Sequence, residues 1–305
     1  MVSNKKKYMT EIIPFDKRDG YIWYNGKLVE WQETKVHVLN HGLHYGNCVF
    51  EGTAVYNNNI FKLREHTERL INSAKLLDYT IPYSVEELEE ATKLIVKTQK
   101  VSNGYIRPFA WRGSERMAIS AKENSVHVAI ATWTWPPYFS VDAKMKGINM
   151  VFAEYKRPAP DTAPSASKAA GLYMICTISK HKAERDGYNE AIMLDFEGYI
   201  AEATCANMFF IINDELHTPK ADRFLNGITR QTIINLAKER GYKVVERRIK
   251  PEELAETQDC FLTGTAAEIT RVNSIETKDK KHKYQFTCHD ITTNLMTDYS
   301  KAIGR

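Results

Sequence analysis

The chain has 305 residues, about twice the ~150 residues of a typical domain, so two domains are expected. Its 43% hydrophobic and 26% charged residues, with 15 glycines and 10 prolines, are ordinary for a globular protein and exclude a collagen-like, mucin-like or wholly disordered chain. The net charge is only +4, and no basic stripe is interleaved with aromatic residues, which argues against a nucleic-acid partner.

No segment predicts a membrane span or an export signal. The longest apolar runs, such as Met208–Ile212, are far too short to cross a bilayer, and residues 1–35 carry charges throughout. The cysteines are odd in number, widely spaced and never in a Cys-x-x-Cys pair: Cys48, Cys176, Cys205, Cys260 and Cys288. These features predict a cytoplasmic protein with free thiols, no metal site and no disulfide.

The N-terminal part begins with two predicted hairpins. Asn25-Gly26 between apolar runs at 21–24 and 27–31 is a strong hairpin signal. Three asparagines join a second pair of predicted strands, at 53–56 and 60–63, and asparagine tolerates the positive φ of a tight turn.

Two helices and two strands follow in the predicted order. Apolar residues at helical spacing predict a helix over 64–78. Ser84 and Glu87 form the pattern of a capping box for a second helix, whose expected buried face is Leu88, Ala91, Ile95 and Thr98. Strands are expected at 105–112 and 126–133. Hairpins with two intervening helices indicate an antiparallel α+β domain.

Consecutive prolines in Trp135-Pro-Pro-Tyr-Phe139 interrupt this pattern because they cannot continue a helix or a central strand. We therefore assign residues 1–134 to a smaller N-terminal domain, 135–147 to an interdomain loop and 148–305 to a larger C-terminal domain. The last part is rich in predicted strands, at 148–152, 190–195, 199–202, 207–212, 215–218, 242–248 and 259–263. Helices are expected near 171–184 and 229–240.

Lys168 is a candidate nucleophile. It stands among Ser, Ala and Gly just ahead of a predicted helix, without a carboxylate in the local sequence. Small neighbours let a planar ligand approach, and a desolvated lysine has a lowered pKa and can attack a carbonyl. A solvated lysine in a Pro/Ala linker is the ordinary alternative.

Three later segments add polar groups that could hold the other end of such a ligand. Glu202 ends a predicted strand before small residues and could pair with a protonated ring nitrogen. Gly227 and Thr229 begin a predicted helix, whose first N–H groups can bind a phosphate. The turn in Leu262–Glu268 offers successive N–H groups to an anion. Taken singly, each segment has an ordinary structural explanation.

Taken together and in this order, the four segments resemble the pyridoxal-phosphate enzymes of fold type IV, and most of all the bacterial branched-chain amino acid aminotransferases. The resemblance covers roughly residues 21–275 and extends through Tyr21-Ile-Trp-Tyr-Asn-Gly26, Lys35-Val-His-Val38, His44-Tyr-Gly46, Val49-Phe-Glu-Gly52, Arg64-Glu-His66 with Arg69-Leu70, and Tyr105-Ile-Arg-Pro108. It implies an α+β fold with a smaller N-terminal antiparallel α/β sandwich and a larger C-terminal mixed, β-barrel-like domain.

The same resemblance implies pyridoxal 5′-phosphate as the cofactor and assigns residues to it. Lys168 would bond covalently to the cofactor and carry the proton, Glu202 would pair with its ring nitrogen and Tyr173 would hydrogen-bond its ring hydroxyl. The phosphate site would comprise Arg69, Ile228, Thr229 and Thr265.

Substrate residues follow from the resemblance as well. The N–H groups of Thr265 and Ala266 would bind the α-carboxylate, and Arg107 would bind the second carboxylate of glutamate or 2-oxoglutarate. The aromatic walls would be Tyr45, Phe50, Tyr105 and Tyr138. Family members build the site across a subunit interface, so a homodimer or higher homo-oligomer is expected.

Three places depart from the usual branched-chain pattern. Ala54 stands where the family commonly carries an arginine. Thr204–Asn207 lacks the usual Gly-Glu-Asn and looks more like the aminodeoxychorismate lyase version. Ala110–Met117 places extra charge where a pocket-lining loop is expected.

The leading hypothesis is transamination between L-leucine, L-isoleucine or L-valine and 2-oxoglutarate. A D-amino acid or (R)-amine transaminase and an aminodeoxychorismate lyase are the alternatives within the same fold, because they would share Lys168 and Glu202. A non-catalytic binding protein would be expected to have lost one of these two residues, and both are present.

Overall fold

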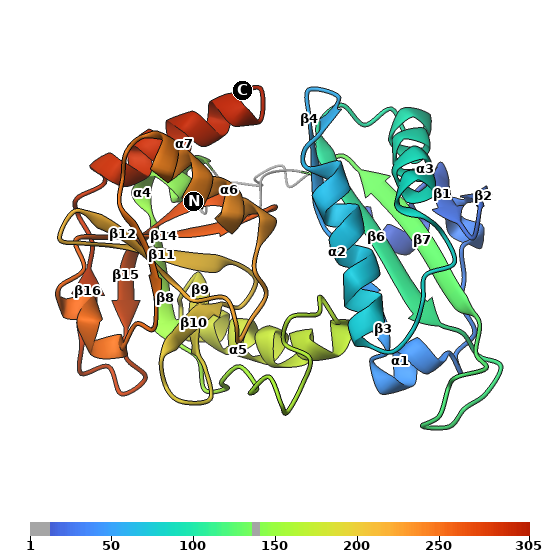
Figure 1. Cartoon of the computed structure of the whole chain (residues 1–305), viewed down its shortest axis with the longest axis horizontal. Coiled ribbons are helices and arrows are strands. Elements are labelled where there is room, and N and C mark those ends of the chain that lie inside the picture. Colours follow the sequence, from blue (N-terminus) through green and yellow to red (C-terminus); the bar gives the residue numbers. More distant parts are fainter. Residues whose placement is uncertain (1–12, 136–140) are drawn as a thin grey trace, which may run out of the picture.

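The computed structural model describes residues 13–135 and 141–305. Its strands form two separate sheets, one built from residues before Trp135 and one from residues after Gly147. Figure 1 shows them side by side, the first sheet in the half that contains the blue strands and the second in the half that contains the orange and red strands. The α+β class predicted from the sequence is confirmed.

The first sheet is antiparallel throughout, with strand order β2-β1-β7-β6-β4-β5 and β3 paired to β6. Its strands are β1 Tyr21–Tyr24, β2 Lys27–Glu30, β3 Cys48–Phe50, β4 Thr53–Tyr56, β5 Asn59–Ile60, β6 Gly104–Arg112 and β7 Val126–Trp133. The turn between β1 and β2 is the predicted one, with Asn25 at φ 47° and Gly26 at φ 92°.

Two helices cover one face of this sheet, α2 Leu63–Leu76 and α3 Val85–Thr98. The capping box of α3 is present: Ser84 Oγ accepts from Glu87 N at 3.1 Å, and Glu87 Oε2 accepts from Ser84 N at 2.7 Å. Helix and sheet side chains form one apolar core, which includes Leu70, Ala74, Leu88, Ile95, Ile106, Val128 and Ile130. Thr98, expected in this core, is only half-buried.

The second sheet is mixed and curls into a half-barrel, with strand order β10-β9-β8-β15-β14-β11-β12-β13 and β16 paired to β15. Its strands are β8 Ile148–Phe152, β9 Glu190–Leu194, β10 Ile200–Ala203, β11 Asn207–Ile212, β12 Glu215–Pro219, β13 Val244–Arg247, β14 Asp259–Gly264, β15 Glu268–Glu276 and β16 Lys283–Gln285. The short turn that joins β10 to β11 is closed by Ala203 N, which donates to Ala206 O at 2.8 Å.

The helices of this half are α5 Met174–Arg185, α6 Ile228–Glu239 and α7 Asp290–Ala302, with a 3-10 turn, η3 Ala170–Tyr173, leading into α5. Shorter elements complete the chain: α1 His41–Tyr45, α4 Val141–Lys146, η1 Phe15–Lys17, η2 Trp31–Glu33 and η4 Pro251–Ala255. The segment 135–147, expected to be a loop, thus contains a helix. Within residues 13–135 and 141–305, no helix combines the length and apolar character needed to cross a bilayer.

Candidate active site

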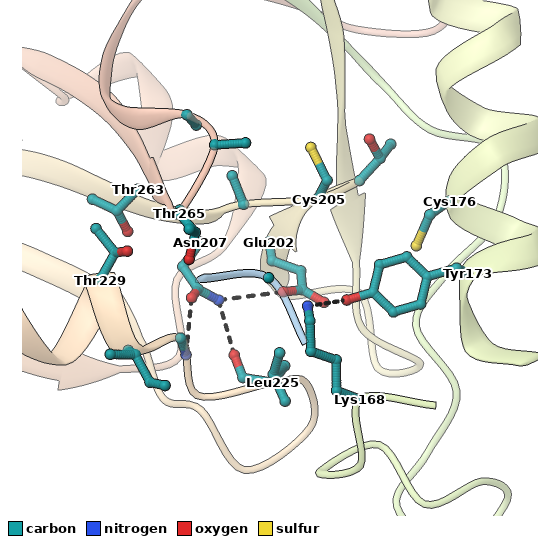
Figure 2. Close-up of a pocket in the computed structure, with 18 of the residues that line it drawn as sticks. Lys168, Tyr173, Cys176, Glu202, Cys205, Asn207, Leu225, Thr229, Thr263 and Thr265 are labelled. Atoms are coloured by element: carbon teal, nitrogen blue, oxygen red, sulfur yellow. Dashed lines mark hydrogen bonds between the residues drawn. The ribbon is translucent and has the colours of Figure 1, made fainter. Parts of the chain in front are cut away.

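A cavity of about 290 Å³ receives side chains from both halves of the chain. The first half contributes Phe50, Gly52, Arg69, Tyr105, Arg107 and Trp135, and the second contributes Lys168, Tyr173, Glu202, Asn207, Ile228, Thr229, Thr265 and Ala266 among others. The four chemical segments found in the sequence therefore meet in one place. Figure 2 shows the second-half residues around Lys168.

Lys168 enters the cavity from an extended segment that is tied to the first half. Its backbone N–H donates to Ser73 Oγ on α2 at 3.0 Å, and its carbonyl accepts from Phe50 N at 3.1 Å. Nζ donates to the Tyr173 hydroxyl at 2.8 Å (Figure 2). Burial lowers the pKa of Lys168, and the positive charge of Arg69 lowers it further. The linker-lysine alternative is wrong, because this lysine is held in a cavity wall.

Glu202 lies inside β10 rather than at an exposed strand end, and it is buried. Its Oε1 is 3.2 Å from Arg157 Nε, and its Oε2 accepts from Asn207 Nδ2 at 3.2 Å. Burial raises the pKa of Glu202 to about 7, although Arg157 and Lys168 pull it down. A carboxylate at the wall of a cavity, with a pKa this high, is suited to pair with a cationic group of a ligand.

Asn207 joins Glu202 to the start of α6. Its Nδ2 also donates to Leu225 O at 3.0 Å, and its Oδ1 accepts from Gly227 N at 3.1 Å (Figure 2). A Cβ on Gly227 would collide with this Oδ1, so the position requires glycine. Gly227 is the N-cap residue of α6, and Ile228 and Thr229 form its first turn at the cavity wall. The first N–H groups of a helix can bind a phosphate.

The turn between β14 and β15 closes the same side of the cavity. Thr265 and Ala266 line it, together with Thr263, whose buried hydroxyl has no hydrogen-bond partner within the described chain. Arg69 reaches the cavity from α2, and its Nη1 faces Asn226 O at 3.4 Å. Hydroxyl, guanidinium and helix N–H groups thus gather on one side of the cavity.

The part of the lining that comes from β3 and β6 is aromatic and carries one positive charge, that of Arg107. Tyr105 and Arg107 are two positions apart on β6, so their side chains lie on the same face of the sheet. Arg107 Nη2 donates to the Tyr105 hydroxyl at 3.1 Å. The Arg107 guanidinium carbon lies 4.7 Å from the centre of the Phe50 ring, and its buried Nε has no hydrogen-bond partner among the described residues. Arg107 is therefore no ordinary surface arginine.

Two predicted wall residues are not found in this cavity. Tyr45 lies on α1, 44% exposed, against the ring of His41, and does not line the cavity of its own chain. Tyr138 lies outside the described residues.

The charged segment Ala110–Met117 also does not line the cavity. Arg112 is buried, and its guanidinium donates to the carbonyls of Ala121 and Asp78. Arg116 pairs with Glu123 at 2.6 Å. These charges have partners nearby in their own chain and do not line its cavity.

The sequence alone does not identify several residues that contact or line the site. Arg157 and Asn207 both contact Glu202, although they are 45 and 5 residues away from it in the sequence. Thr204 and Cys205 line the cavity, and the Thr204 hydroxyl donates to buried Glu190 at 2.6 Å. No spacing rule relates these residues, because the sheet brings them together.

Comparison with known proteins agrees with this geometry. The family model described as amino-transferase class IV matches residues 48–275. The chain is 43% identical over 284 residues to a probable branched-chain-amino-acid aminotransferase of Rickettsia felis, covering 93% of this chain and 96% of that protein. It is also similar to two crystal structures of the T.th. branched-chain amino acid aminotransferase, each covering 94% of both chains. One contains pyridoxamine 5′-phosphate (TM-score 0.88, 36% identity), and the other contains N-(5′-phosphopyridoxyl)-L-glutamate (TM-score 0.86, 35% identity).

Proposed function

The chain belongs to the class IV aminotransferases, as a pyridoxal-phosphate-dependent enzyme of the branched-chain type, and we propose that it exchanges the amino group between L-leucine, L-isoleucine or L-valine and 2-oxoglutarate. We infer the L configuration of the amino acids, 2-oxoglutarate as the amino-group acceptor and the role of each site residue. Residues 1–134 and 148–305 would be the two domains that enclose the site.

The residues of the cavity fit the cofactor. Lys168 and Tyr173 would lie at its aldehyde and ring hydroxyl, and Glu202 would hold its ring nitrogen. Arg69, Ile228, Thr229 and Thr265 would bind its phosphate, and the same cavity is lined by the Thr263 hydroxyl, which has no hydrogen-bond partner in the described part of the chain. When bound, pyridoxal phosphate supplies an electron-withdrawing ring that stabilises negative charge at the substrate Cα.

Lys168 supplies the base of the reaction. Because burial and Arg69 lower the pKa of its ammonium, Nζ can exist as the neutral amine that accepts a proton from Cα and returns it. Tyr173 accepts a hydrogen bond from Nζ and so orients it. Glu202, in contact with Arg157 and Asn207, would be ionised when it pairs with the protonated ring nitrogen of the cofactor.

Arg107 is the single observation that carries the choice of acceptor. Its guanidinium lies among aromatic rings, and its Nε has no hydrogen-bond partner among the described residues. The rings would contact the apolar side chain of leucine, and the guanidinium would bind the second carboxylate of glutamate. The T.th. relative carries a glutamate adduct of the cofactor in its structure, which supports glutamate as a substrate here.

Single-turnover spectra of the two half-reactions test this proposal. Arg107→Met should slow the glutamate half-reaction far more than the leucine half-reaction, because only glutamate has a second carboxylate. Arg116→Met, on the exposed Glu123 pair, is the control and should change neither. Equal losses in both half-reactions would show that Arg107 binds the α-carboxylate or stabilises the fold instead.

The substrate class is tested with wild-type holoenzyme against L-leucine, D-alanine, (R)-1-phenylethylamine and aminodeoxychorismate. The proposal expects L-leucine to react fastest. A faster reaction with D-alanine or the (R)-amine would favour the alternative transaminases, and conversion of aminodeoxychorismate would favour the lyase.

We further propose that two copies of the chain form a homodimer and that Tyr45 serves the partner's site. Large apolar side chains are exposed on and around α1 and on the loop after β6: Val36, Val38, Leu39, Leu43, Met117 and Ile119. A second copy would cover this surface. Tyr45, exposed beside it, would then reach the other subunit's cavity.

Mixing two impaired variants tests this arrangement. In a heterodimer of Lys168→Ala and Tyr45→Ala chains, the site with an intact Lys168 would receive an intact Tyr45 from the other chain. Activity should therefore reappear on mixing. If Tyr45 serves its own chain, both sites remain impaired and no activity returns.

A further inference from the structure

Glu51 is a fully buried carboxylate beside the cavity, in the turn between β3 and β4, and the proposed reaction gives it no part. Both of its oxygens have partners. Oε1 accepts from Arg69 Nε at 2.6 Å, and Oε2 accepts from Arg69 Nη2 at 2.9 Å. Oε2 also lies 2.7 Å from His66 Nδ1 and 3.2 Å from Gly52 N.

In this cluster the Glu51 carboxylate pairs with the guanidinium of Arg69 and the imidazole of His66. Burial alone would raise the pKa of Glu51, but Arg69 and His66 outweigh it and hold that pKa well below its usual range. Burial lowers the pKa of His66, against the pull of Glu51. A carboxylate only accepts hydrogen bonds, so the ring presents its Nδ1–H to Glu51.

The pairing leaves the Arg69 guanidinium a single orientation. Two of its three nitrogens are held by Glu51 in a fork, which fixes the guanidinium plane. The third, Nη1, faces Asn226 O, one residue before the N-cap of α6. Arg69 therefore meets the start of α6 with the nitrogen that Glu51 leaves available.

From this geometry we infer that Glu51 is a positioning residue, which through Arg69 sets the affinity of the site for the phosphate group of the cofactor. The inference rests on the proposed assignment of Arg69 and the start of α6 to the phosphate. Only a carboxylate satisfies both held nitrogens of Arg69. The amide of glutamine would turn an N–H₂ group toward one of them, and the guanidinium would rotate away.

The test compares two cofactors that differ only in the phosphate. Holoenzyme is freed of cofactor and titrated with pyridoxal phosphate or with pyridoxal, and binding is followed by the absorbance of the bound cofactor. Glu51→Gln should weaken pyridoxal phosphate binding by about 10- to 100-fold, the range known for losing a residue that orients a metal-binding side chain through a hydrogen bond. Pyridoxal binding should change little.

Matched variants separate positioning from general damage to the fold. Asp259→Asn is the control, because Asp259 is also buried and also pairs with a histidine, His289, but its other side-chain partner is Thr292 instead of Arg69. It should leave the ratio of the two affinities unchanged. In an Arg69→Ala background, Glu51→Gln should have no further effect on that ratio. In Glu51→Asp the side chain is too short to accept from both Arg69 Nε and Nη2, so the ratio of the two affinities should lie between those of the wild type and Glu51→Gln. This variant replaces Glu51→Gln in the test if Glu51→Gln does not fold.

Two results would overturn the inference: an equal loss of affinity for both cofactors in Glu51→Gln, or no loss for pyridoxal phosphate. The proposed function fails differently. If the wild type binds pyridoxal as tightly as pyridoxal phosphate, the phosphate site is assigned wrongly, whatever Glu51 does. If binding behaves as expected but no amino acid reacts, the positioning role stands and the transamination does not.

Discussion

Lys168 Nζ donates a 2.8 Å hydrogen bond to the Tyr173 hydroxyl, and this contact joins a lysine that is anchored to the first half to a tyrosine at the start of α5. The amine is buried between the rings of Phe50 and Tyr173, 4.9 and 5.2 Å from their centres. Its place therefore depends on both halves of the chain, and so does its lowered pKa.

Lys168→Ala should abolish turnover, because no other amine occupies this position. The variant should still bind pyridoxal phosphate weakly through the phosphate groups but lack the absorption band of the lysine-bound cofactor. Lys182→Ala, on the exposed side of α5, is the control and should keep both band and activity. Normal turnover in Lys168→Ala would refute the assignment.

Glu202→Gln should reduce turnover by roughly 10²-fold or more, the usual cost of losing one aimed electrostatic group. The cavity keeps its shape, but the charge that would pair with the ring nitrogen is gone. Steady-state kcat and KM measure the effect, with Glu252→Gln on the surface as control. A rise in KM with kcat intact would show that Glu202 has another role.

The cofactor-free protein should lose stability as the pH rises through 7. Burial raises the pKa of Glu202 to about 7, above its value of about 4.3 in the unfolded chain. The folded state then holds this proton more tightly than the unfolded state. The stabilisation is complete below the unfolded pKa and is lost as the pH rises through the folded one.

The side chain at position 202 cannot titrate in Glu202→Gln, so this variant lacks the contribution of Glu202 to the pH dependence of stability. The unfolding temperature of the cofactor-free variant, minus that of the wild type, should increase between pH 5 and pH 8. A constant difference would mean that Glu202 ionises with its ordinary pKa. With pyridoxal phosphate bound, the trend should weaken, because an ionised Glu202 would then have a cationic partner.

Gly52→Ala should impair substrate binding without removing the cofactor. A Cβ at this position would collide with the Tyr105 hydroxyl, so the ring must move, and Arg107 loses its 3.1 Å contact with it. Displacements of about 1 Å in a site can cost up to ~10²-fold in kcat/KM. Gly171→Ala is a matched control, since its nearest neighbour would lie 3.5 Å away. An unchanged kcat/KM for leucine in Gly52→Ala would show that Tyr105 does not shape the pocket.

Elements with strong local signals agree closely with their predictions. The Asn25-Gly26 turn, the Ser84 capping box and strands β6 and β7 depend on neighbours a few residues away, so their patterns are visible in the sequence. In contrast, β15 alternates weakly between polar and apolar residues and was not predicted. It lies between β14 and β8 inside the second sheet, and those partners make it a strand.

The candidate site divides in the same way. Lys168, Glu202, Thr229 and Thr265 were recognisable from the sequence because each stands in a local pattern with a chemical meaning, and the order of these patterns along the chain points to the family. The pairings that give them their properties were not recognisable. Arg157 meets Glu202 across 45 residues, and Glu51 meets Arg69 across 18, because packing decides which buried charges face each other. The sequence by itself therefore determined which reactive groups the chain carries, since local spacing and residue type are written in it. Only the tertiary structure decided their pKa values, their orientation and the exclusion of Tyr45 from its own cavity, because burial and charge pairing arise between segments that are far apart in the chain.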